Sequence, residues 1–199
     1  MQTELLAALV GFAFVTSITP GPNNLMLLAS GVNYGVRRTV PHMLGISLGH
    51  ALMVFLVGLG LAQVFDELAW SRPALAVASV LYMGWLALRI ATAAPPKGAQ
   101  ATGRPLTFLQ AAAFQWVNPK AWVMALTAVT AYAAGTDWLS VLVVAVVFAM
   151  VNLPSVSTWA VAGQQLRRWL NEPRRLRAFN IAMAVLLMAS LVPLVAELA

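Results

Sequence analysis

Six long stretches of apolar residues dominate this chain and limit the folds open to it. About 20 predominantly apolar residues, wound as a helix, are enough to cross a lipid bilayer. Long uninterrupted runs such as 141–150 favour helices over the alternating pattern of a barrel strand. The sequence therefore predicts an all-α integral membrane protein with six transmembrane helices, at roughly 5–30, 40–64, 73–92, 106–134, 138–163 and 178–196.

The composition supports a lipid environment. Only 9% of the 199 residues are charged and the mean hydropathy is +0.81, whereas a soluble domain carries about 25% charged residues. The chain has no cysteine, which excludes disulfides and thiolate metal sites. Its sequence also lacks a Walker A loop, a pair of carboxylates within the apolar stretches, and a cluster of Asp, Glu and His. We therefore expect neither an enzyme nor a bound cofactor or metal.

The charged residues predict the orientation in the membrane. Basic residues concentrate in loops that face the cytoplasm, and here they gather in alternate connections, which leaves both chain termini outside. Anionic lipid headgroups are their expected partners, so the formal net charge of +6 requires no nucleic acid. The expected cytoplasmic cations are Arg37, Arg38, Arg89, Lys97, Arg104, Arg167, Arg168, Arg174, Arg175 and Arg177, whereas Glu4, Asp66, Glu67, Asp137 and Glu197 lie on the other side with Arg72.

Two proline-containing breaks divide the chain into similar halves. The first, at 16–24, interrupts the first predicted helix, and the second, at 114–120, interrupts the fourth. This pattern predicts a first three-helix repeat at 1–95, a cytoplasmic linker at 96–105, and a second three-helix repeat at 106–199. Because three is odd, the second half crosses the membrane in the opposite sense. Interrupted helices at matching positions of inverted repeats indicate the binding site of a transporter.

Broken helices expose backbone groups that suit an amino acid. Proline removes an N–H and pushes the residue before it out of the helical region, so a half-helix is expected to begin near Asn23. Its free N–H groups suit a carboxylate, while the carbonyls before the break, with the hydroxyls of Thr16 and Thr19, suit an ammonium group. Packing alone explains many single breaks, but two matched breaks favour a site. The candidate substrate-binding residues are Thr16, Thr19, Pro20, Gly21, Pro22, Asn23, Asn24, Asn118, Pro119, Lys120 and Asn152.

Three of the polar residues have open alternatives. His50, near the middle of the second predicted helix, is either a functional group, as a proton carrier that couples transport to the proton gradient or as a substrate ligand, or a neutral histidine bonded to a neighbouring helix. Lys120 either lies deep enough to hold a substrate carboxylate or extends to the inner surface. Asn152 stands two residues before Pro154, at a third and milder break, as a lining residue or a gate.

Several motifs together resemble one family. Residues 19–24, which read TPGPNN, followed by GVRR at 35–38 and GISLGH at 45–50, closely resemble the start of the LysE/RhtB amino-acid exporters. VNPK at 117–120 resembles the second signature of that family, and the resemblance covers the whole chain in length, span number and placement of breaks. It implies a secondary transporter that exports amino acids across the bacterial cytoplasmic (inner) membrane, generally driven by the proton gradient, with its site at the two breaks.

One departure from the family bears on the substrate. In exporters of basic amino acids an aspartate tends to stand near the His50 position and another follows the Asn-Pro break, where this chain has His50 and Met124. A site without a carboxylate suits a cationic side chain poorly, so we expect a small neutral amino acid or derivative, as in the homoserine/threonine and cysteine/O-acetylserine branch. The alternatives are a basic amino acid or metal-ion exporter of related architecture, and a membrane scaffold that transports nothing. Six helices are compatible with a homodimer, and the sequence locates no interface.

Overall fold

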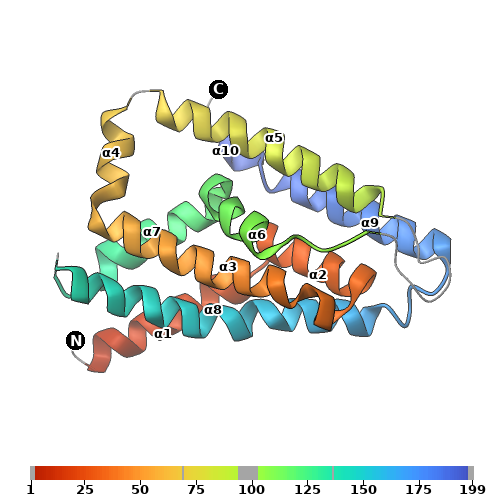
Figure 1. Ribbon diagram of the computed structural model, residues 1–199, viewed down its shortest axis with the longest axis horizontal. Helices are drawn as coiled ribbons and strands as arrows, with labels where there is room; N and C mark the ends of the chain where they lie inside the picture. Colours follow the sequence, from red (N-terminus) through yellow and green to blue (C-terminus); the bar gives the residue numbers. More distant parts are fainter. Residues whose placement is uncertain (1–2, 69, 94–102, 136, 197–199) are drawn as a thin grey trace.

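The computed structural model describes residues 3–68, 70–93, 103–135 and 137–196, and this part of the chain is helical without β-strands (Figure 1). Most of the predicted linker at 96–105 lies outside the described residues. The elements are α1 (Thr3–Ile18), α2 (Pro22–Tyr34), α3 (Val36–Leu56), η1 (Val57–Leu61), α4 (Ala62–Glu67), α5 (Ser71–Ala91), α6 (Phe108–Phe114), η2 (Gln115–Val117), α7 (Pro119–Tyr132), α8 (Trp138–Leu166), α9 (Pro173–Ala189) and α10 (Val192–Ala196).

Several helices are long and apolar enough to cross a membrane. Among the described residues these are Val36–Leu61, Ser71–Ala91, Trp138–Leu166 and Pro173–Ala196. α1 and α2 form a fifth crossing if they are counted as one span, bent by 55°. This confirms the prediction of an all-α membrane protein. Because α6 and α7 have only 7 and 14 residues, the sixth span and the two inverted repeats remain predictions.

The first break separates α1 from α2 at the predicted prolines. α1 ends at Ile18, and α2 begins at Pro22, whose missing N–H is tolerated in the first turn of a helix. Gly21, just before α2, is fully extended, with φ and ψ both 177°. The ladder of helical hydrogen bonds is therefore interrupted, and the two half-helices meet at 55°.

The second break follows the same chemistry. α6 ends at Phe114, and one 3-10 turn carries the chain to Asn118. Asn118 precedes a proline and is extended, with φ −94° and ψ 108°, because the proline ring obstructs the helical conformation of the residue before it. α7 then starts at Pro119. Both interruptions thus fall where the sequence predicts them.

α8 is the longest helix in the described part of the chain and runs beside α1, α2 and α3 (Figure 1). Glycines let the backbones of α2 and α8 approach closely. A Cβ atom at Gly31 would collide with the carbonyl of Ala160, and one at Gly163 would collide with the carbonyl of Leu28. Because α8 belongs to the second half of the chain and α1–α3 to the first, this helix packs the second half of the chain against the first.

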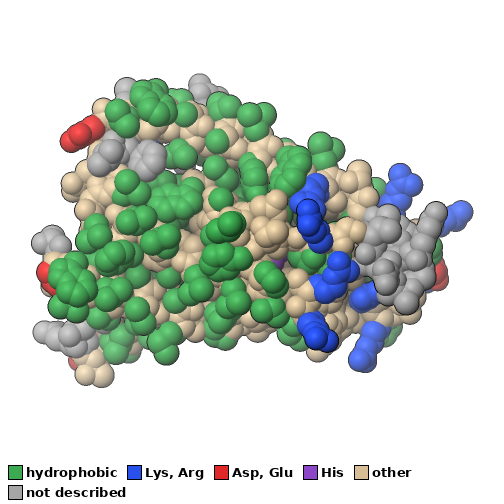
Figure 2. All heavy atoms as spheres, in the orientation of Figure 1, with side chains coloured by type: hydrophobic (Ala, Val, Ile, Leu, Met, Phe, Trp, Pro, Cys, Tyr) green, Lys and Arg blue, Asp and Glu red, His purple; other side chains and the backbone are tan. Residues whose placement is uncertain are grey.

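Charged and apolar surfaces are separated along the bundle. Arg and Lys side chains gather at one end of the molecule, most of the visible acidic side chains lie at the other, and hydrophobic side chains cover the face between them (Figure 2). Phe14, Leu81, Leu109 and Met150 are each more than half exposed. A continuous exposed apolar surface of this kind is covered by lipid in a membrane protein. The separation agrees with the predicted distribution of basic and acidic loops.

Candidate functional site

A polar cavity lies where the two breaks meet. It is formed by the end of α1 and the starts of α2 and α7, together with α3 and α8. Its empty volume is about 310 Å³, opening included, but the space open to the centre of a water molecule is only about 20 Å³. That is room for about one water, so the cavity is nearly closed in this conformation. It is lined by Thr16, Ser17, Gly21, Asn23, Asn24, His50, Asn118, Lys120, Ala121, Met124, Asn152 and Val156.

The structure brings most of the predicted site residues to this one cavity. The exceptions are Thr19 and the prolines, which do not line it. Pro22 and Pro119 start the two helices around the cavity, and Pro20 interrupts the chain before α2. The carbonyl and hydroxyl oxygens of Thr19 accept hydrogen bonds from Nζ of Lys120.

Asn23 and Gln115 join the two breaks directly. The Nδ2 atom of Asn23 donates to Oε1 of Gln115 at 2.8 Å, and Nε2 of Gln115 donates back to Oδ1 of Asn23 at 3.2 Å. Gln115 is fully buried and also donates to the carbonyl of Ala111 at 2.9 Å. Gln115 is not among the site residues predicted from the sequence, although an amide within an apolar stretch, three residues before Asn118, is a signal that could identify it.

Side chains satisfy the carbonyls that the first break leaves free. Nδ2 of Asn24 donates to the carbonyls of Ser17 at 2.8 Å and Thr19 at 2.7 Å. Nε1 of Trp159, on α8, donates to the carbonyl of Ile18 at 3.0 Å. In an unbroken helix the N–H groups of the next turn would donate to these carbonyls. Here the side chains of Asn24 and Trp159 donate to them instead, so the carbonyls stay hydrogen-bonded inside the protein.

Lys120 reaches from the second break to the first. Its Nζ atom donates to the carbonyl of Thr19 and to its hydroxyl, each at 2.9 Å, and to the carbonyl of Pro20 at 3.3 Å. The half-buried side chain therefore turns into the protein. Its ammonium binds carbonyls that were predicted to hold a substrate ammonium, because Gly21 has no side chain to exclude it.

Asn152 connects three helices at the cavity wall. Its Oδ1 accepts from the hydroxyl of Ser47 at 2.9 Å, and its Nδ2 donates to the hydroxyl of Ser17 at 3.0 Å. Its predicted place in the site lining agrees with the geometry, but the predicted break beside it is wrong. α8 continues through Pro154, because one proline removes only one backbone bond from a helix that packs along much of its length.

Several buried polar atoms at the cavity have no partner among the described residues. They are both ring nitrogens of His50, Oδ1 of Asn24 and Oδ1 of Asn118. His50 is 1% exposed, and its ring lies edge-on to that of Phe148, with 5.3 Å between the centroids. Buried polar atoms are nearly always hydrogen-bonded. Four unpaired atoms around one cavity therefore require a polar partner there, which a bound ligand or an ordered water can supply.

The electrostatics of the cavity favour a negative group. α2 and α7 both begin at it, and neither start is capped by a side chain, so the positive ends of both helix dipoles lie at the cavity. The ammonium of Lys120 adds a full positive charge. No carboxylate is among the lining residues, and no group of three or more Asp, Glu or His in the described part of the chain could hold a metal ion.

Interrupted helices around a polar cavity, within an apolar helical bundle, define a class of multi-pass membrane protein. The sequence pattern of the LysE type translocators matches residues 14–196, and the chain belongs to this family. The family and the apolar helices make it a multi-pass protein of a bacterial inner membrane. The resemblance noted from the two break motifs is thereby confirmed.

Similar proteins carry a more specific name. The chain is 33% identical over 193 residues to the cysteine/O-acetylserine efflux proteins of Escherichia coli (strain K12) and Shigella sonnei (strain Ss046). The same identity holds for the protein of that name from Shigella flexneri serotype 5b (strain 8401). Each alignment covers 94% of this chain and 95% of the relative. No solved structure matches the chain significantly.

Proposed function

We propose that this protein exports a small neutral amino acid or derivative through the cavity between the two helix breaks. Relatives named as cysteine/O-acetylserine efflux proteins support a substrate of that size. The observation that carries the proposal is the set of unpaired buried atoms on His50, Asn24 and Asn118. Unpaired polar atoms inside a membrane protein are costly, and a polar substrate bound among them supplies their partners.

The two charged ends of an amino acid have different partners in this site. The uncapped starts of α2 and α7 and the positive charge of Lys120 attract the carboxylate. The free amide oxygens of Asn24 and Asn118 suit the ammonium group. This assignment replaces the expectation that backbone carbonyls of the first break bind the substrate ammonium, since Lys120 already holds those of Thr19 and Pro20.

The remaining wall of the cavity supports a neutral side chain. Ala121, Met124 and Val156 supply apolar surface, and the lining contains no carboxylate. A cationic side chain would lie near Lys120 without a counter-charge, which is unfavourable at low dielectric. A small neutral side chain requires no charged partner, so it fits the site better than lysine or arginine does.

Transport requires the cavity to open first to one side of the membrane and then to the other. The present conformation has room for about one water, so an amino acid needs the cavity to widen. In transporters with two interrupted helices, one half rocks against the other around a central site. The Asn23–Gln115 pair, which joins the two breaks, has to open or shift in such a movement. Buried and unpaired, His50 is our candidate for the residue that carries a coupled proton.

Ligand-dependent thermal stabilisation of the purified protein tests this function. A ligand at a hundredfold excess over its Kd raises the free energy of unfolding by about 2.7 kcal/mol. We expect stabilisation by cysteine, O-acetylserine, threonine or homoserine, and none by the amide of the same compound, which lacks the carboxylate. Asn118→Ala should remove the effect.

The other outcomes separate the competing functions. Stabilisation by lysine or arginine alone would contradict a neutral substrate. No stabilisation by any amino acid, in a protein that unfolds cooperatively, would favour a scaffold that transports nothing.

A further inference from the structure

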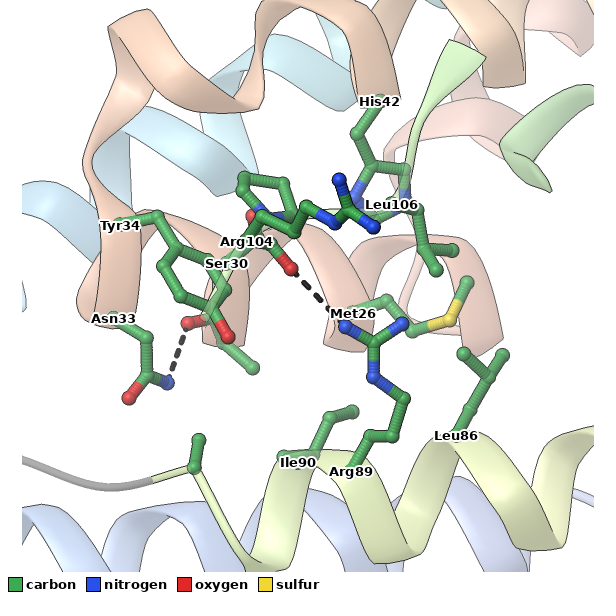
Figure 3. Close-up of a pocket in the computed structure, with 13 residues that line it drawn as sticks. Met26, Ser30, Asn33, Tyr34, His42, Leu86, Arg89, Ile90, Arg104 and Leu106 are labelled. Atoms are coloured by element: carbon green, nitrogen blue, oxygen red, sulfur yellow. Dashed lines mark hydrogen bonds between the residues drawn. The ribbon is translucent and has the colours of Figure 1, made fainter. Parts of the chain in front are cut away.

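A second cavity lies between α2, α3, α5 and the segment that follows residue 103 (Figure 3). It is at the end of the bundle where the basic side chains gather (Figure 2). Its empty volume is about 450 Å³, opening included, and about 50 Å³ of that is open to the centre of a water molecule. Met26, Leu86 and Leu106 form an apolar wall, and Arg89 and Arg104 supply the charge.

Both arginines keep unused hydrogen-bond donors at this cavity. Nη2 of Arg89 donates to the backbone carbonyl of Arg104 at 3.2 Å, and the guanidinium of Arg89 lies 5.0 Å from the ring centre of Trp85. A guanidinium has five N–H donors, so most of them remain available. No ion pair to either arginine is found among the described residues, and no carboxylate lines the cavity.

His42 is a second and independent sign of a ligand. It lines the cavity from α3, is only 2% exposed, and has no hydrogen-bond partner on either ring nitrogen in the described part of the chain. A neutral imidazole carries one N–H donor, and a buried donor is rarely left unpaired. In Figure 3 His42 comes from α3, on the side of the cavity opposite Arg89 of α5. A ligand that accepts hydrogen bonds can satisfy all three side chains.

We propose that this cavity is a binding site for a small anion, a carboxylate or phosphate carried on a short apolar group. The anionic end binds between Arg89 and Arg104, which suit planar or tetrahedral oxyanions, and accepts a hydrogen bond from His42. The apolar part lies against Met26 and Leu86. Two sources offer this chemistry at the basic end of the bundle: a soluble carboxylate such as that of an amino acid, and the phosphate headgroup of a membrane lipid.

The position of this cavity also gives it a relation to the central one. Asn23 lines the central cavity, and Met26, Ser30 and Asn33 line the second. These four residues stand three, four and three positions apart, which places them on one face of α2. An anion bound here therefore lies along the same face of α2 as the central cavity. The two cavities share no lining residue. The proposed anion site is therefore independent of whether substrate passes through the central cavity.

Thermal unfolding of the full chain, held in phosphatidylcholine nanodiscs at constant ionic strength, tests the site. Sodium acetate and sodium phosphate are the soluble probes, and nanodiscs that contain phosphatidylglycerol are the lipid probe. We expect saturable stabilisation by at least one probe. In Arg89→Gln/Arg104→Gln the half-saturating amount should rise about tenfold or more, as expected for the loss of a charge-assisted hydrogen bond. The matched control is Arg167→Gln/Arg168→Gln, which removes the same charge from exposed residues at the same end.

Each outcome decides the proposal or names the source of the anion. Saturation by acetate or phosphate in neutral nanodiscs identifies a soluble ligand, and saturation only with phosphatidylglycerol identifies a headgroup. No saturable effect of any probe, or an equal loss in the control, overturns the site. If the double variant does not fold, Arg104→Gln alone is the test, because Arg104 is exposed. The half-saturating amount should then rise in this variant, and an unchanged amount overturns the site. Asn118→Ala should keep the anion response even if it abolishes transport, which separates this proposal from the function of the central cavity.

Discussion

The side-chain amides of Asn23 and Gln115 exchange two hydrogen bonds, 2.8 and 3.2 Å long, between residues that stand 92 positions apart in the chain. Each residue belongs to one of the two helix breaks. A reciprocal amide pair satisfies the donor and the acceptor of both groups at once, and Gln115 has no access to solvent that could replace its partner. The two interrupted helices are therefore held together at the cavity by a pair of hydrogen bonds, and both are lost when either side chain is removed.

The first prediction concerns this pair. Asn23→Ala leaves the amide of Gln115 short of a partner while buried, which costs about 1–3 kcal/mol, and Gln115→Leu does the same to Asn23. We expect both single variants to insert and fold but to lose transport, and the double variant to cost less than the sum of the two in unfolding free energy. If the double variant loses as much unfolding free energy as the two single variants together, the two residues are not coupled. Normal transport by Asn23→Ala would also contradict the role of the pair.

Lys120 gives a second prediction. Lys120→Met keeps an unbranched side chain, one atom shorter, but removes the ammonium that binds the carbonyls of Thr19 and Pro20. We expect amino-acid binding to weaken by about tenfold or more, since the positive charge that attracts the substrate carboxylate at low dielectric is lost and each 1.4 kcal/mol is a factor of ten. Isothermal titration measures the change. Gly21→Ala is the companion variant, because its new Cβ would lie 2.8 Å from Cδ of Lys120 and displace the chain. Unchanged affinity in both variants would exclude Lys120 from the site.

A third prediction alters the substrate. Met124 lines the cavity, and Met124→Asp places a carboxylate where the lining has none. We expect the preference for lysine over cysteine, measured as a ratio of transport rates, to rise by about tenfold or more, the scale of one buried charge pair. Met124→Asn, which has the same shape without the charge, is the matched control. If both variants change the ratio equally, charge does not set the substrate class.

The fourth prediction tests proton coupling. His50→Ala should leave amino-acid binding but make efflux independent of a pH gradient across the membrane, because the proposed proton carrier is absent. His42→Ala is the matched control, since His42 is equally buried and unpaired but lines the other cavity. Efflux from proteoliposomes at several external pH values measures the dependence. A response in His50→Ala that equals that of the parent would make His50 a structural residue.

The close approach of α2 and α8 gives a prediction on stability. In Gly163→Ala the new methyl group would collide with the carbonyl of Leu28 on α2, and crowding of this kind costs about 1–3 kcal/mol. Gly84→Ala on α5 is the control, because a Cβ there meets nothing within 4 Å. Thermal unfolding of the purified variants should show a lower midpoint for the first and an equal or higher one for the second. Equal midpoints would mean that the two helices can separate freely.

The sequence could predict the two breaks because their cause is local. Pro22 and Pro119 each begin a helix, and the extended conformation of Asn118 follows from the proline after it. The same local reasoning failed at Pro154, where α8 continues. Packing along the helix outweighs one lost backbone bond there, and packing against distant segments is not visible in local sequence.

The contacts inside the site could not be predicted for a related reason. Gln115 lies in the right segment, but its pairing with Asn23 depends on how α2 and the 3-10 turn approach each other in space. The direction of Lys120 depends on the room left by Gly21, which belongs to the other half of the chain. Local patterns located the residues of the cavity, while the choice between protein and substrate as their partners required the fold.

Efflux of radiolabelled O-acetylserine or cysteine from preloaded proteoliposomes tests the central claim most directly. We expect saturable efflux by the parent protein, strong reduction in Asn118→Ala, and no reduction in Thr130→Ala, which changes an exposed residue of α7 outside the central cavity. We also expect an excess of the unlabelled amino acid to compete with the labelled one. Efflux no faster than from empty liposomes, with a folded and inserted protein, would contradict the claim that this cavity exports a small neutral amino acid.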